Sequence, residues 1–391
     1  MFSIITPTHN PQFLAETHAS LQAQGGVPFE WVIVPSPDVF DLLPDCVRAD
    51  SRVRVVPYRG EPLIGAIKNF AFNLGRGDVL VELDHDDLLV PGALAAIRKQ
   101  IDKGADFVYS DTASFNSDTL QPAVYAPDFG WTSYPMTVYG RTFYAAESFE
   151  VNARSLCEIA FAPDHVRCWT KKAYQALGGH DVLMCVGDDH DLLCRTYLAG
   201  HKFASTGACH YLYRIHDGNT VKHRHTMIQD QSRFNRDKYL RPLIYQWSTR
   251  HGHPGCMIHG QSRLNAWCPT SDSFTLVSSA GSLQTLTLDE CIQFFNKAHN
   301  ALVPGGWLII DVPSSDDEHI WDDPHCKSYH SPSSFDWFTD HEYASLDPSI
   351  TCRFQAVSVK NVFDQQTKRL HVQAELMALK GSQRVPGQCK I

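Results

Sequence analysis

The sequence lacks long apolar runs, closely spaced cysteine pairs and an excess of positive charge. None of its apolar stretches approaches the roughly 18 residues that a membrane-spanning helix needs. The chain does not open with a basic segment followed by an apolar one, so we expect no signal peptide and a cytoplasmic location. The 12 cysteines include no Cys-x-x-Cys pair, and we expect reduced thiols. A net charge of −9 disfavours nucleic acid as a general partner.

The chain does contain enough apolar residues for more than one core. Hydrophobic residues make up 43% of 391 residues, a length that usually divides into two or three units. Where the patterns change, we place domain boundaries: residues 1–250, a linker over 251–268 and a smaller domain over 269–391. Charge is also uneven, because residues 211–263 contain nine basic and three acidic residues. Such a segment is either a solvated helix face or a surface for phosphates.

The first hundred residues alternate strand-like and helix-like patterns. Short β-branched runs at 2–6, 30–34, 53–57 and 79–83 predict strands, and residues 64–74 predict a helix between the last two. This alternation indicates an α/β fold with a largely parallel sheet. Ligands bind beyond the carboxyl ends of the strands in such sheets, so the residues after each strand are the candidates for chemistry.

An acidic run follows the fourth predicted strand. Asp84, Asp86 and Asp87 lie within four residues, and carboxylates this close raise one another's pKa unless a cation is present. Oxygen ligands favour Mg²⁺ or Mn²⁺, which would hold a diphosphate. The alternative is a helix N-terminus that carries acids, since carboxylates are favourable there.

Further motifs accompany the acidic run in a fixed order. They are Ser3-Ile-Ile-Thr-Pro-Thr-His-Asn10, Gly65-Ala-Ile-Lys-Asn69, Gly187-Asp-Asp-His-Asp-Leu192 and Tyr213-Arg-Ile-His216. Together they resemble the family-2 glycosyltransferases of the GT-A fold, over roughly residues 1 to 250. The resemblance implies a Rossmann-like mixed sheet that binds a nucleoside-diphosphate sugar, and a hexosyl- or pentosyltransferase activity.

The resemblance implies a donor site around the acidic run. Asp84 and Asp86 match the family's Asp-x-Asp pair, which contacts the ribose and a Mn²⁺ or Mg²⁺ ion; we expect Asp86 to bind the metal. His216 is either a further metal ligand or an ordinary structural histidine. Asp87 is expected to cap the following helix. The other residues assigned to the nucleotide sugar are Thr6, Pro7, Thr8, Lys68, Asn69, His85 and Arg214.

One motif departs from the family. Its members usually follow the second strand with two aspartates, a glycine and a serine that help to read uracil. This chain has Val34-Pro-Ser-Pro-Asp38 instead, so Asp38 or Ser36 would have to substitute. UDP is therefore only the default donor nucleotide.

The acceptor side is expected around a second acidic cluster. In the resembled enzymes this cluster carries the catalytic base of an inverting transfer, which takes a proton from the acceptor hydroxyl. Asp189 is the first candidate and Asp188 the second; the alternative is a solvated, acidic start of a helix. Trp131, His165 and Arg167 are candidate acceptor residues, although the aromatic segment 125–150 could simply be a packed loop.

The last third of the chain has a different pattern. A helix over 288–300, a Pro-Gly-Gly turn and a strand over 307–312 resemble the second half of a class I methyltransferase. The region lacks Gly-x-Gly, which that fold uses to approach its cofactor, so we expect a reduced α/β domain without S-adenosylmethionine. Such a domain could cover the transferase, form a homodimer or present the acceptor.

The predicted function is thus an inverting, metal-dependent glycosyltransferase. It would move a sugar from a nucleoside-diphosphate sugar to a hydroxyl of a glycan acceptor. Three alternatives remain: transfer to a hydroxylated base in DNA, an inactive sugar-nucleotide-binding module, and a bifunctional methyltransferase.

Overall fold

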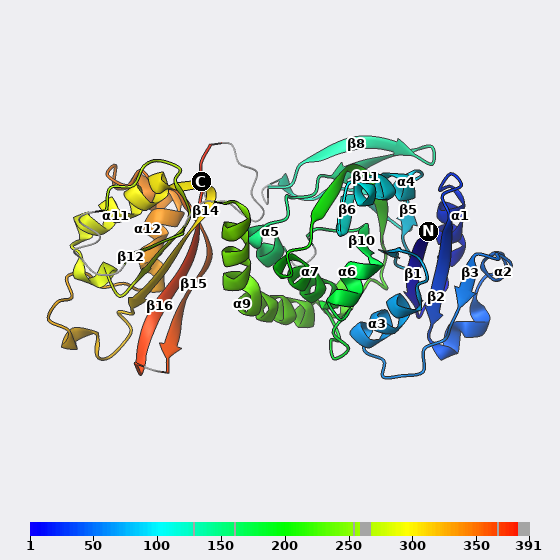
Figure 1. Ribbon diagram of the computed structural model, residues 1–391, viewed down its shortest axis with the longest axis horizontal. Coiled ribbons are helices and arrows are strands. Elements are labelled where there is room, and N and C mark those ends of the chain that lie inside the picture. Colours follow the sequence, from blue (N-terminus) through cyan, green and yellow to red (C-terminus); the bar gives the residue numbers. More distant parts are fainter. Residues whose placement is uncertain (128–129, 160–161, 253–254, 259–266, 366, 382–391) are drawn as a thin grey trace. The chain divides into compact units, whose positions relative to one another are not determined.

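A computed structural model describes residues 1–127, 130–159, 162–252, 255–258, 267–365 and 367–381 of the chain. These residues form two compact units, Met1–Leu243 and Ile244–Ile391, both drawn in Figure 1. The division falls within the long helix α9 (His225–Arg250). Residues 259–266 of the predicted linker lie outside the described residues, and the predicted domain bounds stay a prediction.

The first unit is built on a mixed sheet of 11 strands. Its main path runs β3-β2-β1-β4-β10-β6-β11-β5. The first four of these strands are parallel, and β10 is antiparallel to both of its neighbours. The strands are β1 Phe2–Thr8, β2 Phe29–Pro35, β3 Val53–Val55, β4 Val79–Glu82, β5 Leu88–Leu89, β6 Phe107–Asn116, β7 Pro122–Ala123, β8 Ser133–Val138, β9 Arg141–Ala146, β10 Arg167–Thr170 and β11 Phe203–Ile215.

Short helices connect the strands of this unit. They are α1 Leu14–Gln22, α2 Asp45–Arg48, α3 Ile64–Leu74, α4 Ala93–Asp102, α5 Ala153–Glu158, α6 Lys171–Ala176, α7 Asp188–Leu198 and α8 Thr220–His223, with the 3₁₀ helix η1 Pro37–Leu42. The helix predicted over 64–74 coincides with α3, and the four predicted strands coincide with β1 to β4. The expectation of a mixed α/β fold is confirmed.

The parallel strands of the first unit bring distant residues together. In Figure 1, β1, β2 and β3 lie side by side, as their pairing requires. Because β1 pairs with both β2 and β4 in parallel, the residues after Thr8, Pro35 and Glu82 meet at one edge of the sheet. Apolar side chains such as Ile4, Trp31 and Val81 are fully buried below this edge and hold the strands in place.

The second unit contains a separate sheet of five strands in the order β12-β13-β14-β16-β15. The first three are parallel, and the last two form an antiparallel hairpin. The strands are β12 Gly255–Ile258, β13 Phe274–Ala280, β14 Leu302–Pro313, β15 Phe354–Asp364 and β16 Arg369–Ala378. The helices are α11 Leu288–Ala301, α12 Asp336–Thr339 and α13 His341–Ser345, with the 3₁₀ helices η3 Leu283–Thr285, η4 Ile320–Asp322 and η5 Pro332–Phe335.

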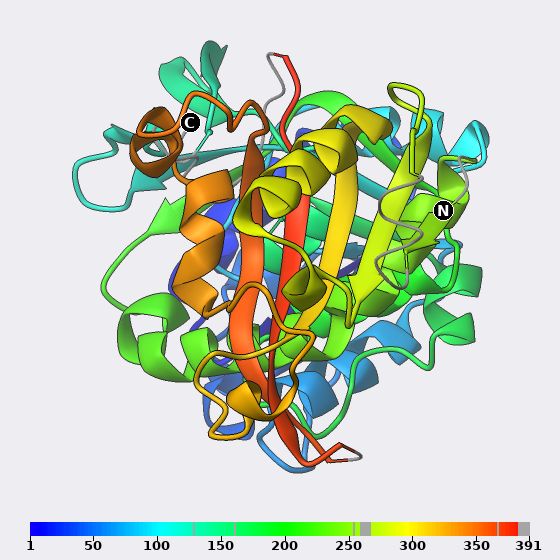
Figure 2. The same cartoon turned by 90° about the vertical axis from the view of Figure 1, so that its left-hand side faces the viewer.

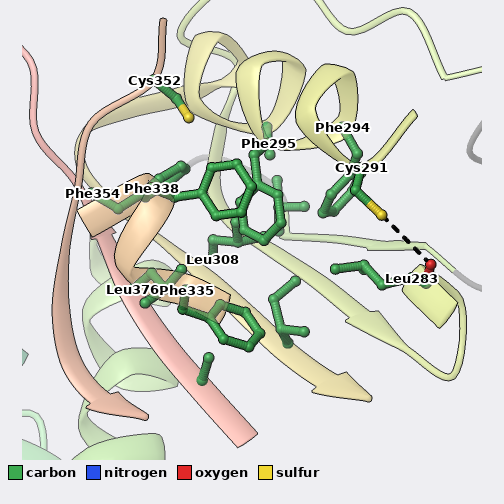
Figure 3. Close-up of a cluster of buried hydrophobic side chains, with 14 of the residues drawn as sticks. Leu283, Cys291, Phe294, Phe295, Leu308, Phe335, Phe338, Cys352, Phe354 and Leu376 are labelled. Atoms are coloured by element: carbon green, nitrogen blue, oxygen red, sulfur yellow. Dashed lines mark hydrogen bonds between the residues drawn. The ribbon is translucent and has the colours of Figure 1, made fainter. Parts of the chain in front are cut away.

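An aromatic core holds the second unit together. Figure 2 shows the yellow helix α11 across one face of the sheet, and Figure 3 shows the side chains below it. The ring of Phe295 on α11 stacks on Phe338 of α12 at 3.7 Å between centroids. Phe354 and Leu308 belong to the same buried cluster. The helix predicted over 288–300 coincides with α11, and the strand predicted over 307–312 lies in β14. The predicted Pro-Gly-Gly turn is wrong, because β14 begins at Leu302 and contains these three residues.

Among the described residues, none of the helices is long and apolar enough to span a membrane. The longest, α9, has 26 residues but carries charged side chains along its length and Pro242 inside it.

Candidate active site

The acidic run after β4 forms a turn at the carboxyl edge of the first sheet. The backbone nitrogen of Asp84 donates to the hydroxyl of Tyr211 at 3.2 Å. The Asp84 carboxylate lies 3.7 Å from Nε2 of His165, whose ring stacks on Tyr211 at 4.6 Å. His165 lies just before β10, the antiparallel neighbour of β4, and is 81 residues from Asp84 in the sequence. The tertiary fold thus brings a candidate acceptor residue against a candidate donor residue.

Asp86 faces His216. Oδ2 of Asp86 lies 2.8 Å from Nε2 of His216, and both side chains are largely buried. Nδ1 of the same ring accepts a hydrogen bond from the backbone nitrogen of Gly218 at 3.1 Å. The imidazole proton of a neutral His216 is therefore on Nε2, pointing at Asp86. Two of the three predicted metal ligands are thus in direct contact.

Asp87 has a different role from the one expected. The N-cap of α4 is Gly92, so the prediction that Asp87 caps this helix is wrong. Its fully buried carboxylate instead accepts hydrogen bonds from the Tyr211 hydroxyl at 2.8 Å and from the Arg214 backbone at 2.7 Å. Burial, together with the neighbouring carboxylates, raises the pKa of Asp87 well above its usual value. Asp87 therefore ties the acidic turn to β11.

Arg214 supports the same turn from below. Its Nε donates to the backbone oxygen of Asp86 at 2.7 Å, and Nη2 lies 2.8 Å from Oε2 of Glu16. The guanidinium also lies over the ring of Phe13, 4.2 Å from its centroid. These contacts bury Arg214 almost completely. Its predicted contact with a diphosphate stays a prediction.

A buried ion network connects the acidic turn to the second acidic cluster. Nζ of Lys68 on α3 lies 2.5 Å from Oε1 of Glu82 and 3.5 Å from Oδ2 of Asp188. Nη1 of Arg167 lies 2.5 Å from Oδ2 of Asp189 and 3.7 Å from Oε2 of Glu82. Glu82 therefore lies between two cations, each of which contacts one of the two candidate bases on α7.

The two candidate bases differ in pKa. Burial raises the pKa of Asp188 to about 6, although Lys68 opposes this effect. Burial also opposes ionisation of Asp189, but Arg167 and Lys68 outweigh it and lower the pKa of that carboxyl. Asp189 is also the more accessible of the two, with 23% of its side chain exposed against 4% for Asp188. At neutral pH, Asp189 is an ionised and reachable carboxylate.

The predicted residues at the ends of β1 and α3 also contribute to the architecture. Oγ1 of Thr6 accepts from the indole nitrogen of Trp31 and donates to the Leu83 backbone, both at 2.8 Å. The hydroxyl of Thr8 bonds the backbone oxygen of Asn10 at 3.0 Å, and Pro7 is half-buried between them. Thr6 thus joins β1 and β2 to the start of the acidic turn.

Three more predicted residues lie around this edge. Asn69 donates from Nδ2 to the backbone oxygens of Gly178 at 3.2 Å and His180 at 2.9 Å, which positions the loop before α7. Asp38 is exposed in η1, just after β2. The half-buried ring of His85 lies edge-on to His9 at 5.0 Å between centroids.

A small aromatic cavity adjoins the acidic turn. Its lining residues are Thr112, Tyr125, Trp131, Ala146, Ser148, Phe149, Ala162, Pro163 and Asp164. The rings of Tyr125 and Trp131 stack at 4.7 Å between centroids. Asp164 lies 3.1 Å from Nδ1 of His165, so the cavity is connected through His165 to Asp84. Of the three predicted acceptor residues, Trp131 lines this cavity, His165 borders it and Arg167 contacts Asp189.

Residues 3–156 match the family model described as Glycosyl transferase family 2. This segment of the first unit is therefore similar to the family-2 glycosyltransferases, as its motifs predict. The match covers β1 to β9 and includes Lys68, Glu82 and the whole acidic turn, whereas Asp188, Asp189 and His216 lie beyond it.

Two curated relatives share shorter segments with the chain. The uncharacterized protein y4gI of Sinorhizobium fredii is 32% identical over 119 residues, which are 28% of this chain and 13% of that protein. The O-antigen biosynthesis protein RfbC of Myxococcus xanthus is 31% identical over 103 residues, or 25% of this chain and 8% of that protein. The matched part of the chain is thus a small fraction of either relative.

Solved structures of S. aureus TarS also resemble the chain. For residues 1–349 of TarS in complex with UDP-GlcNAc, the TM-score is 0.44 at 15% identity, covering 77% of this chain and 81% of that one. For the complex of the same TarS residues with UDP, the TM-score is 0.42 at 17% identity, and the match covers 63% of this chain and 70% of that one.

The segment that matches family 2 contains one charged residue that the sequence analysis missed. Glu82 is 1% exposed and joins Lys68 to Arg167. Its signal in the sequence is a single charge inside the apolar run 79–83. Glu82, Asp84 and His165 also place one potential ligand atom each within 4.8 Å of one another. Lys68 and Arg167 repel a cation from Glu82. Among the described residues, Asp84, Asp86 and His216 do not form such a group of three, so the structure does not bring all three predicted metal ligands together and their role stays a prediction.

Proposed function

We propose that the first unit is an inverting, metal-dependent glycosyltransferase of the GT-A fold. It takes a sugar from a nucleoside-diphosphate sugar, with UDP as the default nucleotide, and transfers it to an acceptor hydroxyl. The observation that carries this proposal is the pairing of Asp189 with Arg167, which keeps a carboxylate ionised and partly exposed. Glu82 links this pair directly to the strand that ends in the acidic turn.

The donor would lie along the carboxyl edge of β1, β2 and β4. Asp84 and Asp86 would hold Mn²⁺ or Mg²⁺, because two carboxylates beside an imidazole suit these ions. When bound, such an ion neutralises the diphosphate that leaves the sugar. His216 can join through Nε2 only if its proton moves to Nδ1, which breaks the bond from Gly218. Thr6, Pro7, Thr8, Asp38, Lys68, Asn69, His85 and Arg214 would shape the nucleotide site.

Asp189 would act as the base. A carboxylate takes a proton from the acceptor hydroxyl as its oxygen attacks the sugar from the face opposite the diphosphate. The close bond to Arg167 holds Asp189 in one position and keeps it ionised, although it also makes the carboxylate a weaker base. Asp188 is the second candidate, and its higher pKa makes it the stronger base but its burial keeps it from the acceptor.

A glycan is the proposed acceptor. Tyr125, Trp131 and the carboxylate of Asp164 beside His165 are the kinds of group that contact a sugar ring, although the cavity that they line has an accessible volume of about 10 Å³ and would have to open to admit one. The basic segment 211–263 supports DNA less well, because several of its cations already pair with carboxylates. These pairs are Arg214 with Glu16, Lys222 with Asp217, Arg233 with Asp230 and Lys238 with Asp191.

For the second unit we propose a reduced methyltransferase-like domain that works without S-adenosylmethionine. The support is its set of three parallel strands followed by an antiparallel hairpin, with α11 directly before β14, the strand that contains the Pro-Gly-Gly segment. Covering the transferase, forming a homodimer and presenting the acceptor are the three roles that this unit could serve.

The proposal is tested first by ligand-induced stabilisation. A ligand that binds only the native state raises the melting temperature by mass action. We expect one of UDP, GDP, CDP and TDP to do so in the presence of Mn²⁺, and Asp86→Ala to abolish that shift. Stabilisation by S-adenosylhomocysteine would contradict the account of the second unit. If none of the four nucleotides stabilises the protein, the transferase proposal fails.

A further inference from the structure

A rigidly held loop follows β14 in the second unit, over residues 314–331. Figure 2 shows this amber segment beyond the ends of the strands. The buried carboxylate of Asp317 holds its start: Oδ1 accepts from the backbone of His319 at 2.8 Å, and Oδ2 from the backbone of Leu370 at 2.5 Å. Arg369 adds a contact to Oδ1 at 3.2 Å. The loop is thus bonded directly to β16.

The far end of the loop is fixed as well. The backbone of Lys327 donates to the oxygen of Gln284 at 2.6 Å, and the backbone of Ser315 donates to His330 at 2.7 Å. Nε2 of the buried His330 lies 2.9 Å from the hydroxyl of Ser328. Ile320 in the middle is 3% exposed and anchors η4. The loop therefore has one conformation before any partner arrives.

Two aromatic rings lie on the surface of this fixed loop. Trp321 is 68% exposed and Tyr329 40% exposed, and their ring centroids are 4.4 Å apart with 41° between the planes. The exposed apolar surface of these rings would gain by burial against a ligand. A second exposed pair, Trp337 and Tyr343, is edge-on at 5.8 Å and 73° and offers no shared face.

The charged residues around Trp321 and Tyr329 indicate which kind of ligand could bind there. Residues 314–331 contain five carboxylates and one lysine. Glu318, Asp322 and Asp323 are exposed and close to Trp321 in the sequence. Asp322 lies 3.1 Å from Nδ1 of His319 and 3.9 Å from Nη2 of Arg369, and Asp323 lies 3.1 Å from Nδ1 of His325, so each keeps only part of its acceptor capacity for a ligand. Such a rim repels phosphates, and therefore nucleic acids and anionic lipids. Carboxylates readily accept hydrogen bonds from hydroxyl groups, and aromatic faces pack on the C–H face of a sugar ring.

We propose that Trp321 and Tyr329 form a binding platform for a neutral saccharide chain. The apolar face of a sugar would stack on the indole, and its hydroxyls would donate to Asp322 and Asp323. This site belongs to the second unit and needs neither a nucleotide nor a metal ion, so it does not depend on the transfer reaction. Its function would be to hold a glycan on the protein.

The test measures binding of neutral hexasaccharides to the full chain by titration calorimetry. The probes are maltohexaose, cellohexaose, chitohexaose and mannohexaose. We expect at least one to bind, and Trp321→Ala to weaken its affinity about tenfold, as loss of an aromatic anchor does. Trp321→Phe should retain most of the affinity. The matched control, Trp337→Ala, removes an exposed tryptophan from the edge-on pair and should leave the affinity within about twofold.

Three results would overturn the platform. They are no binding of any of the four probes, equal binding by Trp321→Ala and the parent chain, and displacement of the saccharide by oligolysine in low salt only. The last result would indicate a cationic protein partner instead. Asp189→Asn should bind the saccharide like the parent chain, so failure of the platform and failure of the proposed transferase are separate outcomes.

Discussion

The carboxyl edges of the two sheets differ in how deeply their charged and polar side chains are buried. At the edge of the first sheet, Lys68, Glu82, Arg167 and Asp188 are all buried. At the corresponding edge of the second sheet, Asp311 is bonded to His371 at 2.6 Å and to Gln373 at 2.9 Å, and these side chains are partly exposed. Below that edge the second unit relies on packed rings such as Phe295.

This difference indicates which edge serves a site and which serves the stability of the fold. Burying a charge costs several kcal/mol, and a nearby partner only partly offsets that cost. A fold has no need for four buried charges at one edge, whereas a site that must hold a carboxylate ionised does need them. At the carboxyl edge of the second sheet the polar groups stay partly exposed and apolar burial supplies the stability, although Asp317 and Glu375 are buried elsewhere in that unit.

The largest expected effect is on transfer. Asp189→Asn removes the proton acceptor but keeps the shape of the side chain and its contact with Arg167. We expect the transfer rate to fall about a thousandfold, within the range of general-base catalysis, while the nucleotide-induced shift in melting temperature is kept. The matched control is Asp102→Asn, on the exposed end of α4. Turnover near the parent rate would remove Asp189 from the mechanism.

The next effect is on stability and tests the buried network itself. Glu82→Gln leaves Lys68 and Arg167 without their shared carboxylate, and removing one partner of a buried pair costs about 3 kcal/mol or more. The loss is measured from the urea-induced unfolding transition of the first unit. An equal or higher free energy of unfolding would show that Glu82 is not required to hold the two cations, and would weaken the contrast between the two edges.

A pH effect follows from Asp188. Burial raises the pKa of this carboxyl to about 6, above its value in the unfolded chain, so the folded state binds more protons between pH 4 and 6. Stability from this group is present at low pH and is lost as the pH rises through about 6. Asp188→Asn mimics the protonated form, and we expect its stability relative to the parent chain to rise by about 2 kcal/mol from pH 4 to pH 7.

Urea titrations at each pH measure that difference for both proteins. The control is Asp289→Asn in the exposed first turn of α11, which should show no such trend. If the free energies of unfolding of Asp188→Asn and the parent chain differ by the same amount at every pH, the pKa of Asp188 is not raised in the folded protein.

The smallest effect lies in the second unit. The hydroxyl of Thr287 accepts from the backbone of Glu290, whose side chain bonds back to the Thr287 backbone at 2.8 Å. Thr287→Ala removes this N-cap of α11 and should cost about 1 kcal/mol. Thermal unfolding measures it, and Thr287→Ser, which keeps the hydroxyl, is the control. If Thr287→Ala lowers the free energy of unfolding by more than Glu82→Gln does, the cap in the second unit matters more for stability than the buried charges of the first.

Much of the first unit could be predicted from the sequence. The strands β1, β2 and β4 and the helix α3 follow from apolar periodicity, because burial on both faces leaves a run that is easy to recognise. The acidic turn and the second acidic cluster could be named, since their motifs are short and contiguous. Asp87 was assigned to the wrong partner, because nothing in the local sequence indicates that it bonds Tyr211 and Arg214, over 120 residues away.

The sequence by itself determined the positions of the first four strands along the chain, the position of the acidic turn and the resemblance of the first unit to the family-2 glycosyltransferases. These depend on neighbouring residues and on a periodicity that the backbone imposes. The tertiary structure alone decided which charges are buried together: Glu82 between Lys68 and Arg167, Asp189 against Arg167, and His216 against Asp86. The physical reason is that the strength of an ionic contact depends on distance and burial, and both arise only when strands far apart in the sequence pair in one sheet.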